Sequence, residues 1–208
     1  MKEIEKMTYL VSTVNHMDEI YWNEIDKAEI SHFCWGDPQV IDCYGQLVYV
    51  KGYGLICHMA AKEEPEIKYL ADADPVYQDC ALEFFLQLGE EGYINCETNA
   101  AGARLQEFGK CNTGRKMIVS TEKNFACLAG IEGDYWSVTI QLPLETLRAY
   151  YPTLSEKNFD GGETFRGNFY KIHDTAVLET SHFGMWQEID NDFPQFHIPA
   201  QFGTFIMA

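Results

Sequence analysis

The sequence predicts an all-β protein: an antiparallel β-sandwich, jelly-roll or immunoglobulin-like, with one or two short helices. Three observations lead to this prediction. Short runs rich in β-branched and aromatic residues recur along the chain between turn residues. Several of these runs alternate apolar and polar side chains with the two-residue period of a strand. Sustained helical periodicity is rare, so many short strands fit the chain better than packed helices do.

The clearest single element is a hairpin inside residues 76–102. Two strand-like runs, residues 81–88 and 93–98, flank the tetrapeptide Gly89-Glu-Glu-Gly. Glycine can adopt the positive φ that a tight reversal needs. We therefore expect the two runs to pair as neighbours near the centre of a sheet.

The first run of this hairpin places a carboxylate among aromatic side chains. Leu82, Phe84 and Leu86 fall on one face of the predicted strand, and Glu83 and Phe85 fall on the other. A buried charge needs a partner or a polar ligand, because desolvating it alone is unfavourable. Glu83 is therefore the first candidate site residue.

The remaining chain continues the same pattern. Further strand-like runs lie at residues 8–12, 27–35, 47–62, 103–108, 116–120, 125–131 and 135–142. Residues 143–150 have room for one or two helical turns before Pro152. No linker, repeat or low-complexity tract interrupts the pattern, so we expect residues 1–208 to form a single domain.

The charge balance narrows the range of partners. Fifteen Lys and Arg residues against 32 Asp and Glu residues give a formal net charge of −17, and the basic residues form no stripe. Such a field repels phosphate groups, so we expect neither nucleic acid nor an anionic membrane as a partner. Solubility alone explains acidity of this kind; a cation or a neutral, hydroxyl-rich ligand is also compatible with it.

The cysteines indicate a reducing environment. Seven cysteines are spaced nine or more residues apart, so the chain has no Cys-x-x-Cys motif for zinc or dithiol chemistry. An odd number of cysteines in strand-like segments favours free, mostly buried thiols. The N-terminus lacks the apolar core of a secretory signal, and we therefore expect a cytoplasmic protein.

Several segments together resemble the family 9 carbohydrate-binding modules, in the family 9-like branch of the DOMON-like β-sandwiches. The segments are Asp79-Cys-Ala-Leu-Glu-Phe-Phe, Tyr93-Ile-Asn-Cys-Glu-Thr-Asn, residues 136–143, Gly167-Asn-Phe-Tyr-Lys, residues 182–186 and Phe196-His-Ile-Pro-Ala-Gln-Phe-Gly-Thr-Phe. The resemblance covers roughly residues 7–207. It implies a non-catalytic module that holds the end of a glycan between two aromatic rings, that contains structural calcium in some members, and that would fit a role in carbohydrate catabolism.

The resemblance assigns roles to four residues. The hydrogen-bonding carboxylate of the family falls on Glu83, and the two stacking aromatic positions fall on Tyr77 and Phe196. An asparagine of the following strand falls on Asn99. This chain departs from the family where it has Tyr77 and Phe196 in place of tryptophan, and where it has Glu97 in place of a basic residue.

Elementary chemistry is compatible with the same site. The C–H face of a pyranose packs on aromatic rings, while its hydroxyl groups need carboxylate, amide or guanidinium partners. Glu83, Asn99 and Arg104 offer such partners, and His197 follows Phe196 directly. For Tyr77 and Phe196, ordinary core packing is the alternative interpretation.

A loop at residues 62–75 contains the weaker candidates for a metal. Asp72 and Asp74 offer oxygen ligands to a hard cation such as calcium, although the loop lacks the spacing of an EF-hand. A solvated acidic loop is the alternative interpretation.

No catalytic motif competes with the binding hypothesis: the sequence contains no nucleophile elbow, zinc-protease motif or P-loop. Glu83 and Glu97 could lie on adjacent strands, but adjacency alone does not make a glycosidase. The alternative function is a metal-dependent enzyme or a haem-binding DOMON-like protein that uses His173, His182 and His197. A third possibility is an interaction module without a small-molecule site.

Overall fold

Strands make up most of the regular structure of this protein. The computed structural model describes residues 5–208; residues 1–4, part of the N-terminus discussed above, lie outside it. The strands are β1 (Thr8–Val14), β2 (Ala28–Glu29), β3 (His32–Gly36), β4 (Cys43–Val50), β5 (Gly54–Ala61), β6 (Ala81–Gly89), β7 (Gly92–Asn99), β8 (Arg104–Gly109), β9 (Lys116–Met117), β10 (Ala126–Glu132), β11 (Tyr135–Pro143), β12 (Thr164–His173), β13 (His182–Met185) and β14 (Gly203–Met207).

Helical structure is limited to short segments between the strands. They are the α-helix α1 (Leu144–Leu147) and the 3₁₀ helices η1 (Met17–Glu19), η2 (Trp22–Glu24), η3 (Val76–Gln78), η4 (Glu156–Phe159), η5 (Leu178–Thr180) and η6 (Pro199–Gln201). The all-β prediction is therefore confirmed, and α1 lies where one or two helical turns were expected. None of the helices found among residues 5–208 has the length and apolar character needed to span a bilayer.

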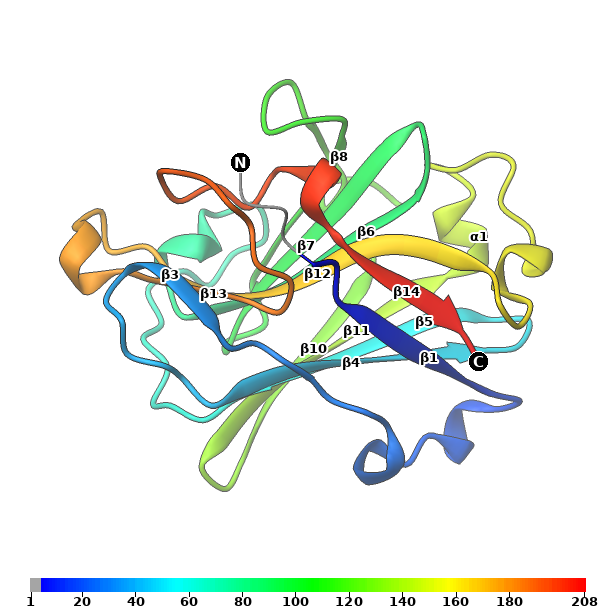
Figure 1. Cartoon of the computed structure of the whole chain (residues 1–208), viewed down its shortest axis with the longest axis horizontal. Helices are drawn as coiled ribbons and strands as arrows, with labels where there is room; N and C mark the ends of the chain where they lie inside the picture. The colour runs from blue at the N-terminus through cyan, green and yellow to red at the C-terminus, as the bar shows by residue number, and fades with distance from the viewer. Residues whose placement is uncertain (1–4) are drawn as a thin grey trace.

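The strands form one continuous curled sheet (Figure 1), in the order β10-β11-β5-β4-β1-β14-β12-β6-β7-β8-β9. Strand β13 adds to β12 and carries β3, while β2 adds to β4. Strand β1 joins the two halves, because residues 8–11 pair with β14 and residues 12–14 pair with β4. The prediction of a sandwich of two sheets needs this correction: β1 belongs to both halves.

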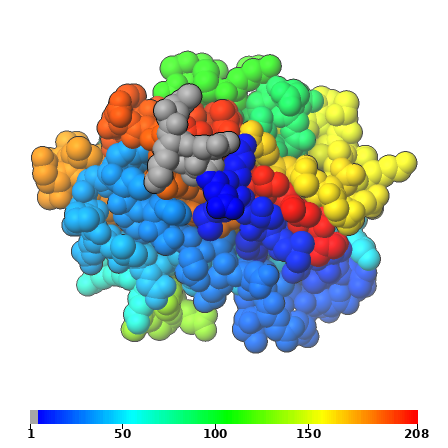
Figure 2. Space-filling model, in the orientation of Figure 1, coloured from blue at the N-terminus to red at the C-terminus, as the bar shows by residue number. Residues whose placement is uncertain are grey.

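Strand β1 also departs from the antiparallel pattern. Both of its pairings are parallel, whereas the other strand pairs of the described chain are antiparallel. Figure 2 shows the consequence at the surface, where the N-terminal strand in blue lies against the C-terminal strand in red. The first and last strands therefore stabilise each other through non-local pairing.

The main hydrophobic core fills the space between the two halves. Leu82, Phe84 and Leu86 of β6 are fully buried there, as their alternation predicted. They share this core with side chains from the opposite half, including Leu47, Leu55, Cys57, Met59, Val138 and Ile140. Burying aliphatic and aromatic side chains of this size stabilises a fold by about 1.5–3 kcal/mol each, before the loss of conformational entropy is counted.

A second, aromatic cluster covers the outer face of β6, β7 and β12, on the side away from the main core. Its members are Trp35, Ala81, Phe85, Tyr93, Tyr170, Ile172, Phe183, Met185, Ile189, Phe196 and Phe202. Residues 186–202, which have no strand of their own, run over this face and contribute three of these side chains. Both faces of the central strands are therefore buried, and polar groups on the outer face are enclosed as well.

The predicted hairpin is confirmed in detail. Strands β6 and β7 pair antiparallel around Glu90 and Glu91, and they lie between β12 and β8 in the sheet. Their register places Glu83 directly opposite Glu97. This pairing of two carboxyl groups is the starting point of the candidate site.

The seven cysteines are all free thiols, as predicted. Cys43, Cys57, Cys80 and Cys96 are buried, Cys127 is half-buried, and Cys34 and Cys111 are exposed. Burial raises the pKa of the Cys57 and Cys96 thiols well above the usual value. These thiols act as small apolar side chains in the core.

The two halves approach closely where Gly45 of β4 faces Phe169 of β12. A Cβ atom at position 45 would lie 2.3 Å from Cδ1 of Phe169. The ring has little freedom to move, because it is fully buried and stacked on Phe84 with a centroid separation of 5.0 Å. Glycine at position 45 therefore allows this contact between the halves.

We expect the substitution Gly45→Ala to destabilise the protein by about 1–3 kcal/mol, as other overpacked cores do. The melting temperature should fall by about 2–4 °C for each kcal/mol. The matched control is Gly130→Ala in β10, where an added Cβ meets no atom within 4 Å, so the melting temperature should stay near that of the unaltered protein. Equal melting temperatures for the two variants would contradict this packing.

Candidate functional site

A pocket of about 530 Å³ opens on the outer face of β6, β7, β8 and β12. It is lined by Tyr77, Glu83, Glu97, Leu105, Glu107, Ile172, Asp174, Ala176, Leu178, Ser181, Phe183, Pro194, Gln195, Phe196 and His197. The strands supply one part of this lining, and the loops at residues 174–181 and 194–197 supply the rest. The volume falls within the range of about 300–1,000 Å³ that is usual for small-molecule sites.

Two carboxyl groups from neighbouring strands lie deep in this pocket. Glu83 is 2% exposed and Glu97 is 4% exposed, and they occupy opposite positions of the β6–β7 pair. Side chains at such positions point to the same face, with Cβ atoms about 4.5–5.5 Å apart. The pocket therefore presents two buried acids side by side.

Burial and mutual repulsion favour the neutral form of these acids. Burial, followed by the charge of Glu97, raises the pKa of Glu83 well above its usual value. Burial raises the pKa of Glu97 to about 8, although a hydrogen bond from Asn95 opposes the shift. Like charges this close do not ionise together at neutral pH, so the pair retains a proton.

A polar network beneath the pocket orients Glu97. Asn95 donates from Nδ2 to Oε1 of Glu97 at 2.8 Å. Arg115 in turn donates from Nε to Oδ1 of Asn95 at 3.0 Å, and its guanidinium lies 4.1 Å from the centre of the Tyr93 ring. Oε2 of Glu97 is buried without a hydrogen-bond partner within the described chain. One oxygen of Glu97 is therefore fixed, and the other is free for a ligand.

Aromatic rings form the apolar part of the lining. Tyr77 of η3 is half-buried. Phe196 is 6% exposed and stacks on Tyr170, with ring centroids 4.0 Å apart and an interplanar angle of 15°. Phe183 packs edge-on against Phe196. Tyr77 is thus a wall residue, whereas Phe196 both lines the pocket and belongs to the aromatic cluster behind it.

His197 adds a neutral imidazole to the lining. Burial lowers the pKa of His197 to about 3, and the nearby Arg115 charge acts in the same direction. Its Nδ1 lies 2.8 Å from the hydroxyl oxygen of Tyr93. Burial also raises the pKa of the Tyr93 hydroxyl, so this hydrogen bond joins two uncharged groups.

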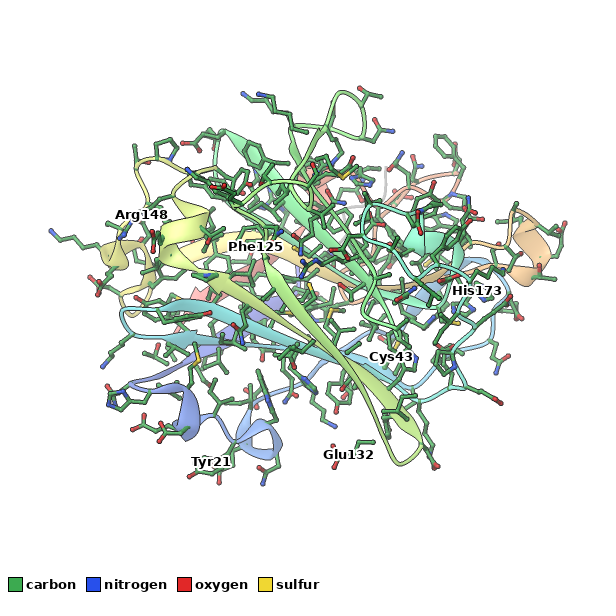
Figure 3. The ribbon with its side chains drawn as sticks, turned by 180° about the vertical axis from the view of Figure 1, so that it is seen from behind. Tyr21, Cys43, Phe125, Glu132, Arg148 and His173 are labelled. Carbon is green, nitrogen blue, oxygen red and sulfur yellow. The ribbon has the colours of Figure 1, made fainter. Side chains whose placement is uncertain are left out.

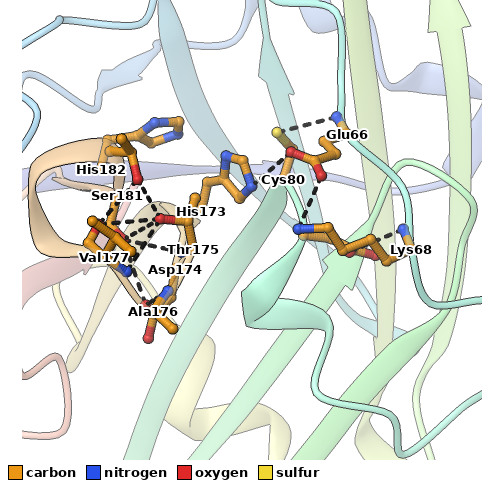
Figure 4. Close-up of polar contacts among 12 residues, drawn as sticks. Glu66, Lys68, Cys80, His173, Asp174, Thr175, Ala176, Val177, Ser181 and His182 are labelled. Carbon is orange, nitrogen blue, oxygen red and sulfur yellow. Dashed lines mark hydrogen bonds and ion pairs between the residues drawn. The ribbon is translucent and has the colours of Figure 1, made fainter.

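Hydrogen bonds brace the loop at residues 174–181 that forms one wall (Figure 4). Oδ1 of Asp174 accepts from the backbone N–H of Ala176 at 3.0 Å. The Ser181 hydroxyl accepts from the backbone N–H of Thr175 and donates to the carbonyl of Val177. The loop is tied to η3 as well, since the N–H of Asp174 donates to the carbonyl of Tyr77. Hydrogen bonds within the protein therefore hold this wall in place.

Four of the six predicted ligand-binding residues meet in this pocket: Tyr77, Glu83, Phe196 and His197. Asn99 does not line it. The Asn99 side chain instead donates to Asp79 and accepts from the backbone of Ala101 and Ala103, so it stabilises the turn after β7. The structure therefore brings Tyr77, Glu83 and Phe196 together and leaves Asn99 outside this pocket.

Arg104 is also outside the lining. Its Nη1 donates to the carbonyl of Phe125 at 3.1 Å. Its Nε lies 3.2 Å from Oδ2 of Asp72, an ion pair without the angle of a hydrogen bond. The guanidinium is thus engaged by the protein and is not brought together with the pocket residues.

The candidate metal ligands Asp72 and Asp74 already have partners within the protein. Asp72 already faces a guanidinium, and Asp74 accepts a hydrogen bond from the backbone N–H of Ala71 at 3.3 Å. Within residues 5–208, no group of three His, Cys, Asp or Glu side chains is arranged to hold a metal ion. The loop therefore fits the alternative interpretation of a solvated acidic segment.

The three histidines of the alternative function do not form one site. His173 and His182 lie side by side, with ring centroids 5.6 Å apart, but His197 contacts Tyr93 in the pocket. The ammonium of Lys171 lies 2.8 Å from Nε2 of His182. An ammonium can only donate, so Nε2 accepts, and the lone pair that a metal would need is already used.

Sequence reasoning missed several polar groups of the pocket. Glu107, Asp174 and Gln195 line it together with the predicted residues. The alternation along residues 104–109 could have assigned Glu107 to one face of a strand. Asp174 and Gln195 carry no such signal, because irregular loops position them.

Comparison with known proteins identifies the family. The sequence profile described as carbohydrate-binding family 9 matches residues 15–207. The chain belongs to carbohydrate-binding family 9. Members of this family are non-catalytic binding modules. No curated protein matches the chain.

Solved structures share the fold of this family 9 chain. A protein from Bacteroides uniformis, described as a candidate carbohydrate-binding protein, is 24% identical, with a TM-score of 0.80 over 98% of this chain and 100% of that chain. A family 9 module from Caldicellulosiruptor kristjanssonii in complex with cellotriose is 14% identical, with a TM-score of 0.64 over 97% of this chain and 93% of that one. The glucose complex of a family 9 module from the same organism is also 14% identical, with a TM-score of 0.59 over 97% and 96%.

The paired acids should weaken the fold as the pH rises. Folded Glu97 holds its proton with a pKa of about 8, whereas the unfolded chain releases it near the usual value of 4.5. Because the folded-state pKa is raised, the protonated Glu97 side chain contributes its full stability below about pH 4.5. This contribution is lost progressively as the pH rises from 4.5 towards 8. We therefore expect Glu97→Gln, which cannot ionise, to gain stability over the unaltered protein by about 1 kcal/mol or more at about pH 8.

Urea unfolding at about pH 5 and about pH 8 measures this gain, which should be larger at the higher pH. Glu132→Gln is the matched control, because Glu132 is exposed on β10 and its variant should show no such increase. A gain for Glu97→Gln that is the same at both pH values would show that Glu97 does not hold a proton in the folded protein.

Proposed function

We propose that this protein binds a saccharide, without catalysis, in the pocket formed by β6, β7, β8 and the loops at residues 174–181 and 194–197. The observation that carries the proposal is that an aromatic surface and an acidic surface line the same cavity. Aromatic side chains, Tyr77 and Phe183 among them, line the same space as the buried acids Glu83 and Glu97. Family membership supports the same function.

The two surfaces match the two sides of a pyranose. Its C–H groups can pack on the aromatic rings, and its hydroxyl groups can donate to or accept from the carboxyl groups. Buried polar groups that lack protein partners give such a site its specificity, because a ligand without matching groups leaves them unpaired. Oε2 of Glu97 is a group of this kind.

We infer further that the ligand enters by its end. The carboxyl-bearing residues are only 2% and 4% exposed, so a ligand must insert into the pocket to reach them. A terminal sugar or a small saccharide can insert, whereas the middle of a long chain would need an open groove. The solved family 9 complexes contain glucose and cellotriose, and these are the first ligands to test.

We expect Tyr77→Ala to weaken saccharide binding at least tenfold, because it removes a half-buried ring from the pocket wall. Isothermal titration calorimetry with glucose and cellotriose measures the effect. Tyr21→Ala is the matched control, since Tyr21 is 59% exposed. Figure 3 shows Tyr21 far from His173, the last residue of β12, after which the wall loop begins. The control should bind as the unaltered protein does.

The melting temperatures of both variants should stay within a few degrees of the unaltered protein. Phe196→Ala is unsuitable for this test, because Phe196 stacks on buried Tyr170 and its removal should destabilise the cluster. Unchanged saccharide affinity in a folded Tyr77→Ala variant would contradict this location of the site.

A further inference from the structure

The pocket is strongly acidic. Glu83, Glu97, Glu107 and Asp174 all contribute to its lining, and no lysine or arginine of the described chain does so. The basic imidazole of His197 stays neutral, because burial lowers its pKa to about 3. A neutral sugar would not require this concentration of carboxyl groups.

The nearest basic side chains are directed elsewhere. Lys171 is fully buried on the opposite face of β12, where its Nζ lies 2.9 Å from Oε1 of Glu63 and 2.8 Å from Nε2 of His182. Arg115 lies beneath the pocket and is bound to Asn95 and Glu107. Within the described chain, Glu107 is therefore paired with a guanidinium, whereas no ammonium or guanidinium forms an ion pair with Glu83, Glu97 or Asp174.

Two of the acids lack the partners that buried acids usually have. Oε2 of Glu97 is buried without a hydrogen bond in the described chain, and the residue as a whole is 4% exposed. No hydrogen bond or ion pair within residues 5–208 involves the Glu83 carboxyl, although its residue is 2% exposed. Buried acids in proteins are normally hydrogen-bonded or paired with a cation, so this arrangement suits a hydrogen-bond donor from outside, and a cationic donor above all.

We propose that the pocket is selective for amino sugars, that is, saccharides that carry a protonated primary amine. The proposal deepens the saccharide-binding function and rests on it. An ammonium group supplies up to three N–H donors and one positive charge, which suits two adjacent carboxyl groups better than a hydroxyl does. The aromatic wall residues then hold the C–H face of the ring.

Binding of an ammonium should release a proton. The free pair retains a proton at neutral pH, and pairing with a cation favours the ionised acids. The charged and titratable groups near the pair are Lys171, Glu107, Arg115, Tyr77, Asp174 and His197. The Lys171 and Arg115 charges already lower the pKa of the acids, and burial and mutual repulsion still dominate.

The direct test compares matched ligands by isothermal titration calorimetry at near-physiological salt and slightly acidic pH. One pair is glucosamine and glucose; the other is the β-1,4-linked glucosamine trimer and cellotriose, which differ only in the amine that replaces each 2-hydroxyl. We expect the amine-bearing member of each pair to bind roughly tenfold more tightly or better. Titrations near neutral pH in two buffers of different ionisation enthalpy should show proton release for the amines alone.

Variants of the two acids separate this preference from general attraction to an acidic protein. Glu97→Gln and Glu83→Gln should each bring the affinity ratio of glucosamine to glucose close to one. Glu132→Gln removes an exposed negative charge and should leave the ratio unchanged.

The outcomes distinguish the two proposals. Glucose and cellotriose binding as tightly as their amine counterparts would overturn amino-sugar selectivity while leaving saccharide binding intact. Failure of all four sugars to bind would overturn both proposals. If both Glu83→Gln and Glu97→Gln still prefer the amine-bearing sugars, the proposal that these two acids select the amine would also be overturned.

Discussion

The register of β6 against β7 is the constraint on which the site depends. It places Glu83 opposite Glu97 on a face that the aromatic cluster closes, so both acids are buried together. Two desolvated carboxyl groups at this separation are unfavourable for the fold. A shift of the register by one residue would turn one acid into the main core instead, and the core side chains Leu82 and Phe84 oppose such a shift.

The rest of the architecture supplies the stability that this pair removes. Strand β1 pairs with both halves of the curled sheet, and the main core fills the space between them. Because β1 and the main core hold the two halves together, the outer face of β6, β7 and β12 is not needed for that contact and can carry a pocket. The aromatic cluster and the Arg115 network then fix the side chains around it, so that the site is formed on rigid strands and braced loops.

Period-two patterning predicted the parts of this protein that depend on local sequence. The β6–β7 hairpin and the face of Glu83 were accessible in this way, while the free thiols were predicted from the odd number of cysteines. Asn99 lies outside the pocket because it ends its strand, where turn hydrogen bonds use its side chain. Arg104 lies outside the pocket as well, where it faces Asp72, a residue far away in the sequence. The parallel pairing of β1 and the loop residue Asp174 depend on non-local contacts that carry no signal in a single sequence.

The central claim is that Glu83 and Glu97 form a proton-retaining pair at a saccharide site. Carboxyl ¹³C chemical shifts of labelled glutamate, followed by NMR against pH with and without sugar, test this claim most directly. The account predicts at least one carboxyl that titrates far above the usual glutamate value of about 4.5 in the free protein and whose titration changes when a sugar binds. Two carboxyl groups that titrate near the usual value, or that no sugar affects, would contradict it.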